Sequence, residues 1–302
     1  MKEKLKRIKI LYSSYIFLKD HVLCFISHFS PVLVSKIRYR QIVGKKLDLK
    51  HPKEFNEKLM WLKLHTYYKN PLIIQCADKV RVREYVRDCD CQEILTNIIG
   101  VYDKPEKIPW ETLPEKFVLK CNHGAGYNIV CNDKKILDIQ KTIKQLRKWL
   151  RTDYSLKYAE VQYHSIKPLI LCEQFLEPEQ GNVPDDYKVY CFNGRAECIM
   201  VCQGRDSGNC RFYFFDREWN WLKWDIGEEK VQSVNCRKPE CLEKLLYYAE
   251  KLSKGFPFVR MDFYIIGTQI FFGEMTFTPC ACLDTDYTEL GNRELSKRLQ
   301  IY

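Results

Sequence analysis

The chain has 302 residues, of which 46% are hydrophobic and 14% aromatic. This composition can bury a sizeable core and excludes a disordered chain. Of the net charge of +10, residues 1–50 carry +9, because they hold 12 Lys or Arg against 3 Asp or Glu. The rest is nearly neutral, which argues against a nucleic-acid groove through the core, so we expect no nucleic-acid partner.

The N-terminal segment 1–50 is predicted to be basic and helical. Basic clusters alternate with apolar and aromatic residues over 1–44, which predicts short amphipathic helices with a break at Ser30-Pro31. Two interpretations stay open. The segment either contacts anionic lipid headgroups, which would place the protein at the inner face of the membrane, or it is a helical appendage with a solvated basic face.

Two further features bear on location. The apolar stretch 22–34 contains serine, histidine and proline, and it is shorter than the roughly 20 residues that span a bilayer, so we expect no secretory signal. The 15 cysteines include no Cys-x-x-Cys pair, and many lie in apolar runs. We interpret them as buried residues in a reducing cytoplasm; a disulfide framework is the alternative.

Residues 51–115 are predicted to form a small α/β domain. Apolar residues recur at helical spacing over 54–65 and 71–88. Residues 97–103 predict a strand, and a proline-rich loop follows.

From residue 116 the pattern changes to strands and tight turns, which predicts a core over 116–302. Its first unit, 116–176, has two strands around a glycine turn, a helix over 137–150 and a buried strand over 168–176. Its second unit, 177–302, is predicted to have a hairpin turning at Asn193-Gly194, a hairpin over 211–224, a helix over 239–255 and two strands turning at Gly267-Thr268.

Two patterns in the first unit could bind a nucleotide. Lys120 ends a strand before the turn 122–126, where backbone N–H groups could contact phosphates while the ammonium neutralises their charge. Glu173 and Phe175 stand at a strand end that could receive a purine ring. The alternatives are an ordinary hairpin turn and an ordinary strand exit.

The second unit carries charged residues on its strands. Asp186 and Lys188 share a strand face, and Arg205 ends the next strand. Two cations on neighbouring strands could hold triphosphate oxygens. A cross-strand ion pair is the alternative.

The last two strands carry Arg260, Asp262 and Glu274. Antiparallel pairing would bring Asp262 opposite or near Glu274. Buried carboxylates side by side repel unless a cation lies between them, and hard oxygen ligands favour Mg²⁺. A structural cluster of arginine and carboxylates is the alternative.

The order of these features resembles the ATP-grasp superfamily, and residues 51–302 resemble its TupA-like branch, named for teichuronopeptide biosynthesis. The resembling segments are FNEKLMWLKLH, ADKVRVREYV, FVLKCNHGAGYNIV, ILCEQFL, DYKVYCFNGR, RFYFFD, FPFVRMDFY and IFFGEMTFTP. The resemblance implies an α+β fold in which two α+β subdomains hold ATP between antiparallel sheets. It also implies an ATP-dependent carboxylate–amine ligase that forms an acyl phosphate and uses Mg²⁺.

The resemblance implies a role for each site residue. The phosphate-binding residues would be Lys120, His123, Gly124 and Gly126; the adenosine site would have Glu173, Phe175 and Asp186; the catalytic cations would be Lys188, Arg205 and Arg260; and Asp262 and Glu274 would hold Mg²⁺. Asp78-Lys79 matches a pair that opens a helix in many such enzymes.

One position departs from the family pattern. Thr276 stands where many ATP-grasp ligases have the asparagine of Glu-x-Asn, and a hydroxyl is a poorer metal ligand than an amide oxygen. Thr276 remains the third candidate ligand, but this change puts two-metal binding in doubt, and Asp284 or Asp286 could compensate.

The resemblance also suggests the substrates, which would be a sugar acid and an amino acid joined in a bacterial capsular or cell-wall polysaccharide or its precursor. Two alternatives remain. One is a glycosyltransferase that uses an Asp-x-Asp pair, Asp88/Asp90 or Asp284/Asp286, to hold a sugar-nucleotide metal. The other is an ATP-binding pseudoenzyme or scaffold at the membrane surface, which Thr276 and the basic N-terminus motivate.

Overall fold

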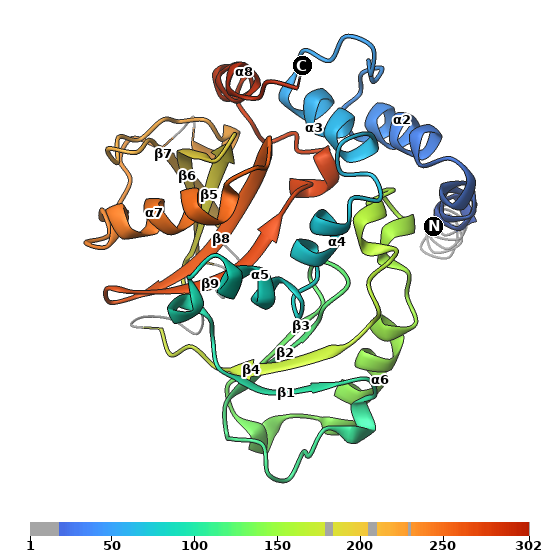
Figure 1. The fold of residues 1–302 in the computed structure, drawn as a ribbon, viewed down its shortest axis with the longest axis vertical. Helices are drawn as coiled ribbons and strands as arrows, with labels where there is room; N and C mark the ends of the chain where they lie inside the picture. The colour runs from blue at the N-terminus through green and yellow to red at the C-terminus, as the bar shows by residue number, and fades with distance from the viewer. Residues whose placement is uncertain (1–17, 179–183, 205–209, 229–230, 302) are drawn as a thin grey trace, which may run out of the picture.

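The computed structural model describes residues 18–178, 184–204, 210–228 and 231–301. Two antiparallel sheets lie one above the other in Figure 1 and organise the molecule. Each sheet has its own cluster of buried apolar residues. The predicted α+β class is confirmed.

The smaller sheet has four strands in the order β1-β4-β2-β3, all antiparallel. Its strands are β1 (Ile98–Tyr102), β2 (Phe117–Cys121), β3 (Asn128–Cys131) and β4 (Ile170–Gln174). Helix α6 (Ile139–Leu150) packs against β2, and the buried Leu146 joins Phe117 and Leu119 in the smaller core. Asp138 begins this helix by accepting a hydrogen bond from the Lys141 backbone N–H at 2.9 Å.

The larger sheet has five strands in the order β7-β6-β5-β8-β9. Its strands are β5 (Asp186–Phe192), β6 (Arg195–Gln203), β7 (Arg211–Phe215), β8 (Phe258–Ile266) and β9 (Gln269–Thr276). Helix α7 (Leu242–Ser253) packs on β5, β6 and β8. The predicted turn at Asn193-Gly194 is confirmed: both residues have positive φ, 49° and 80°, which a type I′ hairpin turn requires.

Most other helices pack with the larger sheet or with one another. They are α2 (Pro31–Ile42), α3 (Phe55–Leu64), α4 (Pro71–Ala77), α5 (Val82–Asp88) and α8 (Glu289–Arg298). Short 3₁₀ turns are η1 (Gln92–Ile94), η2 (Pro105–Lys107), η3 (Lys134–Ile136), η4 (Tyr154–Leu156), η5 (Val161–Tyr163), η6 (Ile226–Glu228) and η7 (Pro279–Cys282).

The segment 51–115 contributes to both cores. Its helices α3 to α5 place their buried residues in the larger core, whereas its strand β1 pairs with β4 in the smaller sheet. The expected boundary at residue 115 therefore passes through a sheet.

Two local expectations need correction. Residues 71–88 form two helices, because Asp78 takes an extended conformation at the end of α4. Its side chain accepts a hydrogen bond from the Val80 N–H at 2.9 Å and so stabilises the turn that precedes α5. Over 211–224 only β7 is a strand. Trp219 and Lys223 have positive φ, which interrupts the returning strand and leaves a single bridge from Phe215 to Trp221.

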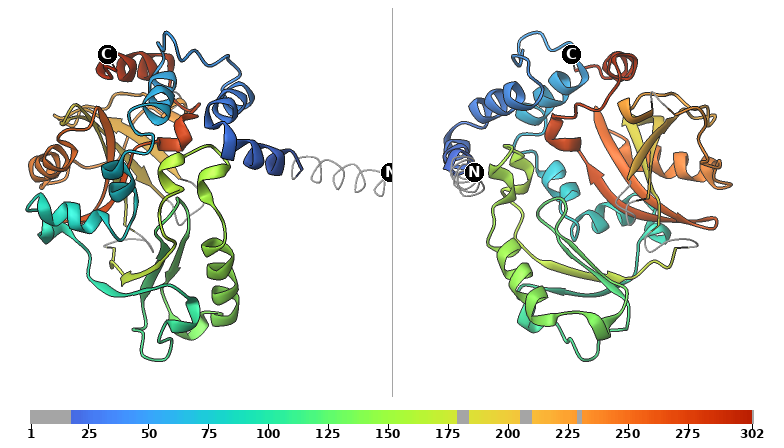
Figure 2. Two further views of the ribbon diagram at one scale, coloured as in Figure 1. Left: turned by 45° about the vertical axis from the view of Figure 1, so that its right-hand side comes forward. Right: turned by 180° about the vertical axis from the view of Figure 1, so that it is seen from behind.

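The described N-terminal part is helical over 18–29 and again over α2, as predicted. Ser30 separates the two helices and caps α2 by accepting from the Leu33 N–H. Figure 2 shows helix 18–29 extending away from the body. Within the described residues, no helix combines the length and the apolar character needed to cross a membrane. None of the 15 cysteines, all of which are described, forms a disulfide, and ten of them are buried.

Candidate active site

Three connected cavities run between the two sheets and past the end of β9. The first has a volume of about 500 Å³, the second about 260 Å³ and the third about 410 Å³. The first shares Lys120, Asn128 and Tyr264 with the second. It also shares four residues with the third, whereas the second and third share none. The first cavity therefore lies between the other two.

Lys120 stands where the first two cavities meet. Strand β2 presents it opposite β4, and its Nζ lies 2.6 Å from Oε2 of Glu173. Burial alone would lower the pKa of Lys120, but the Glu173 carboxylate raises it above its ordinary value. Burial alone would also raise the pKa of Glu173, but Lys120 lowers it. Both groups are therefore charged at neutral pH.

The second cavity is mainly apolar around this ion pair. Val118, Val130, Phe175 and Leu176 line it, together with Glu173. Arg83 and Thr96 hold the Glu173 carboxylate from behind: the Thr96 hydroxyl donates to Oε1 at 2.8 Å, and Arg83 Nη1 lies 3.5 Å away. The second cavity is thus a mainly apolar space with one fixed carboxylate, and both Glu173 and Phe175 line it.

The glycine turn forms one wall of the first cavity. Ala125 and Gly126 line the cavity, and Gly126 has a φ of +74° that favours glycine. Gly124 packs against the Tyr154 ring, and a Cβ there would lie 2.6 Å from the ring carbon Cγ. His123 lies beneath the turn, where its Nε2 is 3.0 Å from the Trp149 carbonyl oxygen. Neither His123 nor Gly124 lines any of the three cavities, so their expected contacts with phosphate stay predictions.

Lys79 connects the turn to the opposite sheet. Its Nζ donates to the Gly124 carbonyl at 2.8 Å and lies 3.0 Å from Oε2 of Glu274. Its side chain is only 9% exposed. The sequence singled out the Asp78-Lys79 pair but left Lys79 out of the site, because nothing local to the pair reveals a contact with β9.

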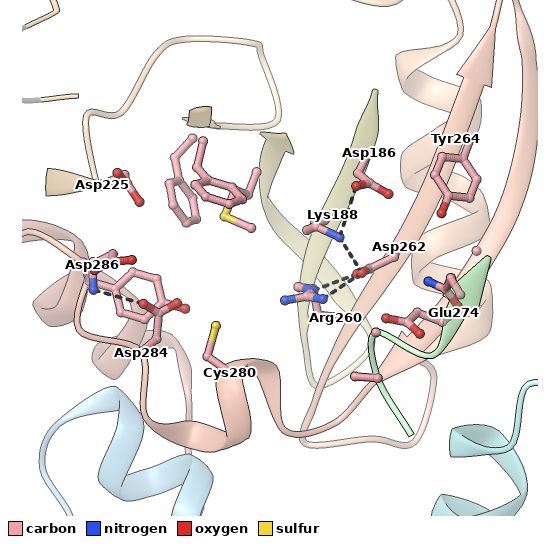
Figure 3. Close-up of a pocket in the computed structure, with 18 of the residues that line it drawn as sticks. Asp186, Lys188, Asp225, Arg260, Asp262, Tyr264, Glu274, Cys280, Asp284 and Asp286 are labelled. Atoms are coloured by element: carbon pink, nitrogen blue, oxygen red, sulfur yellow. Dashed lines mark hydrogen bonds and ion pairs between the residues drawn. The ribbon is translucent and has the colours of Figure 1, made fainter. Parts of the chain in front are cut away.

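A cluster of charges lies on β5 and β8, as Figure 3 shows. Lys188 pairs across the strands with Asp262, with Nζ 2.7 Å from Oδ2, and it lies 3.8 Å from Asp186 on its own strand. Arg260 holds both oxygens of Asp262 at 2.7 Å. The predicted shared face of Asp186 and Lys188 is confirmed, and so is the cross-strand ion pair that was its alternative. Arg205 lies outside the described residues.

Asp262 and Glu274 are direct partners in the register of β8 and β9, as predicted. Burial alone would raise the pKa of Glu274, but Lys79, Lys188 and Arg260 lower it well below its ordinary value. Thr276 donates to Oε1 of Glu274 at 3.3 Å and faces the third cavity. Two carboxylates on paired strands are a donor set that fits Mg²⁺. The described residues hold no group of three His, Cys, Asp or Glu side chains that could bind a metal by themselves.

The far end of the first cavity is acidic, a feature the sequence indicated only in part. Asp225, Asp284 and Asp286 line it beside Cys280 and Tyr287. Burial raises the pKa of Asp225 to about 6. The Asp284/Asp286 pair therefore lies in the site, whereas Asp88/Asp90 lies at the end of α5 and lines none of the three cavities.

The sequence matches the model of one protein family, TupA-like ATP-grasp, over residues 57–299. The chain belongs to this family. The match covers most of the chain and includes every described site residue. No curated protein matches the sequence. Family membership confirms the predicted ATP-grasp fold, and the two sheets with a cavity between them are its framework here.

Solved structures of ATP-grasp ligases are similar at low sequence identity. D-Alanine–D-alanine ligase from Helicobacter pylori is 14% identical with a TM-score of 0.43, and the match covers 81% of this chain and 69% of that one. The same enzyme from Bacillus anthracis, complexed with ATP, is 12% identical with a TM-score of 0.42 and coverages of 67% and 55%. The chain thus spans about half the length of the B. anthracis enzyme.

Proposed function

We propose that this protein is an ATP-dependent carboxylate–amine ligase that works through an acyl phosphate. One observation carries the proposal: Lys79, Lys120, Lys188 and Arg260 all line the first cavity, around the paired carboxylates Asp262 and Glu274. Such a cavity suits a polyphosphate with its cation, because fixed cations neutralise phosphate charge without reorganisation during the reaction. The apolar second cavity beside it suits a purine.

The two cavities suggest how ATP would be held. Adenine would occupy the second cavity between Phe175 and Val130, near Glu173, with the ribose close to Asp186. Lys120 stands where the cavities meet and would contact the α- and β-phosphates. The turn at Gly124 to Gly126 would cover them through its backbone N–H groups.

Asp262 and Glu274 would hold Mg²⁺. The ion would neutralise charge on the nucleotide phosphates and orient the terminal one. Both carboxylates now pair with cations, Asp262 with Lys188 and Glu274 with Lys79. We expect these lysines to shift toward the phosphate oxygens when the nucleotide binds.

The reaction would proceed in two displacements. A substrate carboxylate oxygen would attack the γ-phosphorus, and ADP would leave. The amine, once it has given up its ammonium proton, would then attack the acyl carbon. Phosphate would leave with the former carboxylate oxygen and take up the proton that the amide nitrogen loses. Lys188 and Arg260 would stabilise the charge that develops at the γ-phosphate and at the acyl oxygen. Arg205 is the third candidate cation for this step.

The substrates follow from the family's link to teichuronopeptide synthesis. We infer that the ligase joins an amino acid to a sugar acid of a surface or capsular polysaccharide or its precursor. A screen of amino acids against uronic acids, with ADP and phosphate measured separately, tests this. We expect equimolar ADP and phosphate from at least one pair. Release of AMP would contradict an acyl phosphate, and turnover of a sugar nucleotide without ATP would favour glycosyl transfer.

The N-terminal helix supports a second proposal, a contact with an anionic membrane surface. Leu18, Val22, Phe25 and Phe29 recur at helical spacing over 18–29 and are 49–76% exposed, whereas Leu23 on the other face is buried. An apolar stripe on a segment with a charge of +9 fits an anionic bilayer interface.

Vesicle sedimentation tests this membrane contact. We expect the protein to sediment with vesicles that contain phosphatidylglycerol and to stay in solution with neutral phosphatidylcholine. The double substitution Phe25→Ser and Phe29→Ser should prevent sedimentation, whereas Ile136→Ser, at an exposed site far along the chain, should not. Equal sedimentation of all three proteins, or none with anionic vesicles, would contradict the contact.

A further inference from the structure

The third cavity differs from the other two in the side chains that line it. Tyr154, Tyr158 and Tyr163 line it with Glu160 and Thr278. The segment 154–163, which carries the tyrosines, passes beside α4 and the end of β9. The rings are held in place, since those of Tyr154 and Tyr163 meet edge to face with centroids 5.1 Å apart. The cavity is therefore built and is not a loose gap between loops.

Glu160 is the notable charge of this cavity. It is only 4% exposed, and its Oε1 accepts a hydrogen bond from the Thr278 hydroxyl at 2.7 Å. Gln162 in turn donates to Thr278 at 2.8 Å, so a chain of hydrogen bonds orients the carboxylate. Among the described residues no Lys, Arg or His forms an ion pair with Glu160. The nearby buried Lys63 donates instead to the Tyr158 carbonyl at 3.0 Å.

The other charges of the cavity are already paired. Arg260 is bound by both oxygens of Asp262, and Glu274 is bound by Lys79. Glu160 forms no direct ion pair within the described residues, although the buried Lys63 lies near enough to act on it electrostatically. A buried carboxylate with so little compensation is costly, and a cation bound against it would relieve the cost. Tyrosine faces also attract cations through their ring quadrupole. A carboxylate ligand would instead be repelled by the Glu160 carboxylate. The side chains that line the third cavity therefore favour an ammonium group.

The position of the cavity fits an amine that attacks an acyl phosphate. Arg260, Glu274, Ala125 and Cys280 belong to both the first and the third cavity, so the third opens at the end where the terminal phosphate would lie. The second cavity, proposed for adenine, touches only the other end. The three cavities thus give an order of base, phosphates and amine.

We propose that the third cavity binds the amine substrate, a primary ammonium compound, with its charge on Glu160 and against the tyrosine rings. This inference rests on the proposed ligase function and adds to it the residue that selects the amine. Glu160 acts in binding and specificity and does not contact ATP.

Binding to the nucleotide-loaded protein tests the inference without turnover. AMPPNP and Mg²⁺ are bound first, and their affinity is measured by calorimetry. Paired probes that differ in the amine are then titrated by ligand-observed NMR: glucosamine against glucose, and L-alanine against L-lactate. We expect the amine of at least one pair to bind about tenfold or more tightly than its hydroxyl partner.

Glu160→Gln should remove this preference and leave AMPPNP affinity unchanged, because glutamine can still accept from Thr278. Glu111→Gln, which changes an exposed glutamate elsewhere, should keep the preference. Equal binding within every pair, a preference that survives in Glu160→Gln, or no binding of any amine would overturn the inference. Failure of AMPPNP to bind would overturn the ligase proposal instead, and the amine preference is then measured on the nucleotide-free protein.

Discussion

The two sheets differ in what they bring to the site. The five-stranded sheet carries Lys188, Arg260, Asp262 and Glu274 on its three adjacent strands β5, β8 and β9. The four-stranded sheet brings one cation, Lys120, with an apolar slot and a glycine turn. The groups assigned to the chemistry therefore stand on the larger sheet, whereas the groups assigned to holding the nucleotide stand on the smaller one. Lys79 is the direct polar link from the turn to the larger sheet.

A large-to-small substitution in the larger core should have the strongest effect on stability. Phe258 is fully buried and packs on Phe55 and Phe192 with ring centroids 5.4 and 5.2 Å away. Phe258→Ala should lower the free energy of unfolding by about 3–5 kcal/mol, measured by urea denaturation. Amide hydrogen exchange should then rise in both sheets, because the small core cannot persist without the large one.

The matched change in the smaller sheet is Phe117→Ala, which is also at a fully buried position. Here exchange should rise in the four-stranded sheet and stay slow in β5 and β8. If Phe117→Ala raised exchange equally in the five-stranded sheet, the two cores would unfold as one unit and the comparison would fail.

The next effect concerns turnover. Lys188→Ala should reduce the rate of ADP release by about 10²–10³-fold, because a fixed cation at the developing charge is removed. Lys251→Ala serves as control, since that lysine lies on α7 outside all three cavities. If the Lys188 variant turned over at the wild-type rate, the assignment of the chemistry to the five-stranded sheet would be wrong.

A smaller effect should follow from the turn. Gly124→Ala places a Cβ against the Tyr154 ring, so the turn or the ring must move, at a cost of about 1–3 kcal/mol. We expect a higher KM for ATP with a nearly unchanged kcat, because the turn belongs to the holding side. Gly126→Ala has open space and strains only the backbone, so its effect should be smaller. A larger rise in KM for Gly126→Ala than for Gly124→Ala would contradict the role assigned to packing against Tyr154.

The smallest effect is a pH dependence. Burial raises the pKa of Asp225 to about 6 from an ordinary 3.8. Between these values the folded chain binds more protons than the unfolded chain, so the free energy of unfolding falls as pH rises through this window. Asp225→Asn should flatten this fall between about pH 4 and pH 6 in thermal melts. An unchanged slope would show that Asp225 is not responsible.

The sequence predicted those parts of the site that depend on strand alternation. Asp262 faces Glu274, and Asp186 shares a face with Lys188, because the pleat and the hairpin turn determine both contacts. The Asn193-Gly194 turn was predictable from the two residues themselves, because asparagine and glycine tolerate the positive φ that a type I′ turn requires.

Contacts between distant segments were not predictable. Lys79 reaches Glu274 from the turn between α4 and α5, and Glu160 reaches Thr278, just after β9, from an irregular segment. Neither contact produces a periodic pattern in the amino-acid sequence. Strand β1 belongs to the smaller sheet by pairing with β4, although its sequence neighbours α4 and α5 belong to the larger core. The local sequence pattern therefore could not show that residues 51–115 contribute to both cores.

The proposed ATP site is tested most directly by the Mg²⁺ dependence of AMPPNP binding, measured by calorimetry with Mg²⁺ and with EDTA. We expect the wild-type protein to bind AMPPNP and to bind it at least about tenfold more tightly with Mg²⁺. Glu274→Gln should lose most of this difference. No binding of AMPPNP to the wild-type protein, or equal affinity with Mg²⁺ and EDTA, would contradict an ATP site built on Asp262 and Glu274.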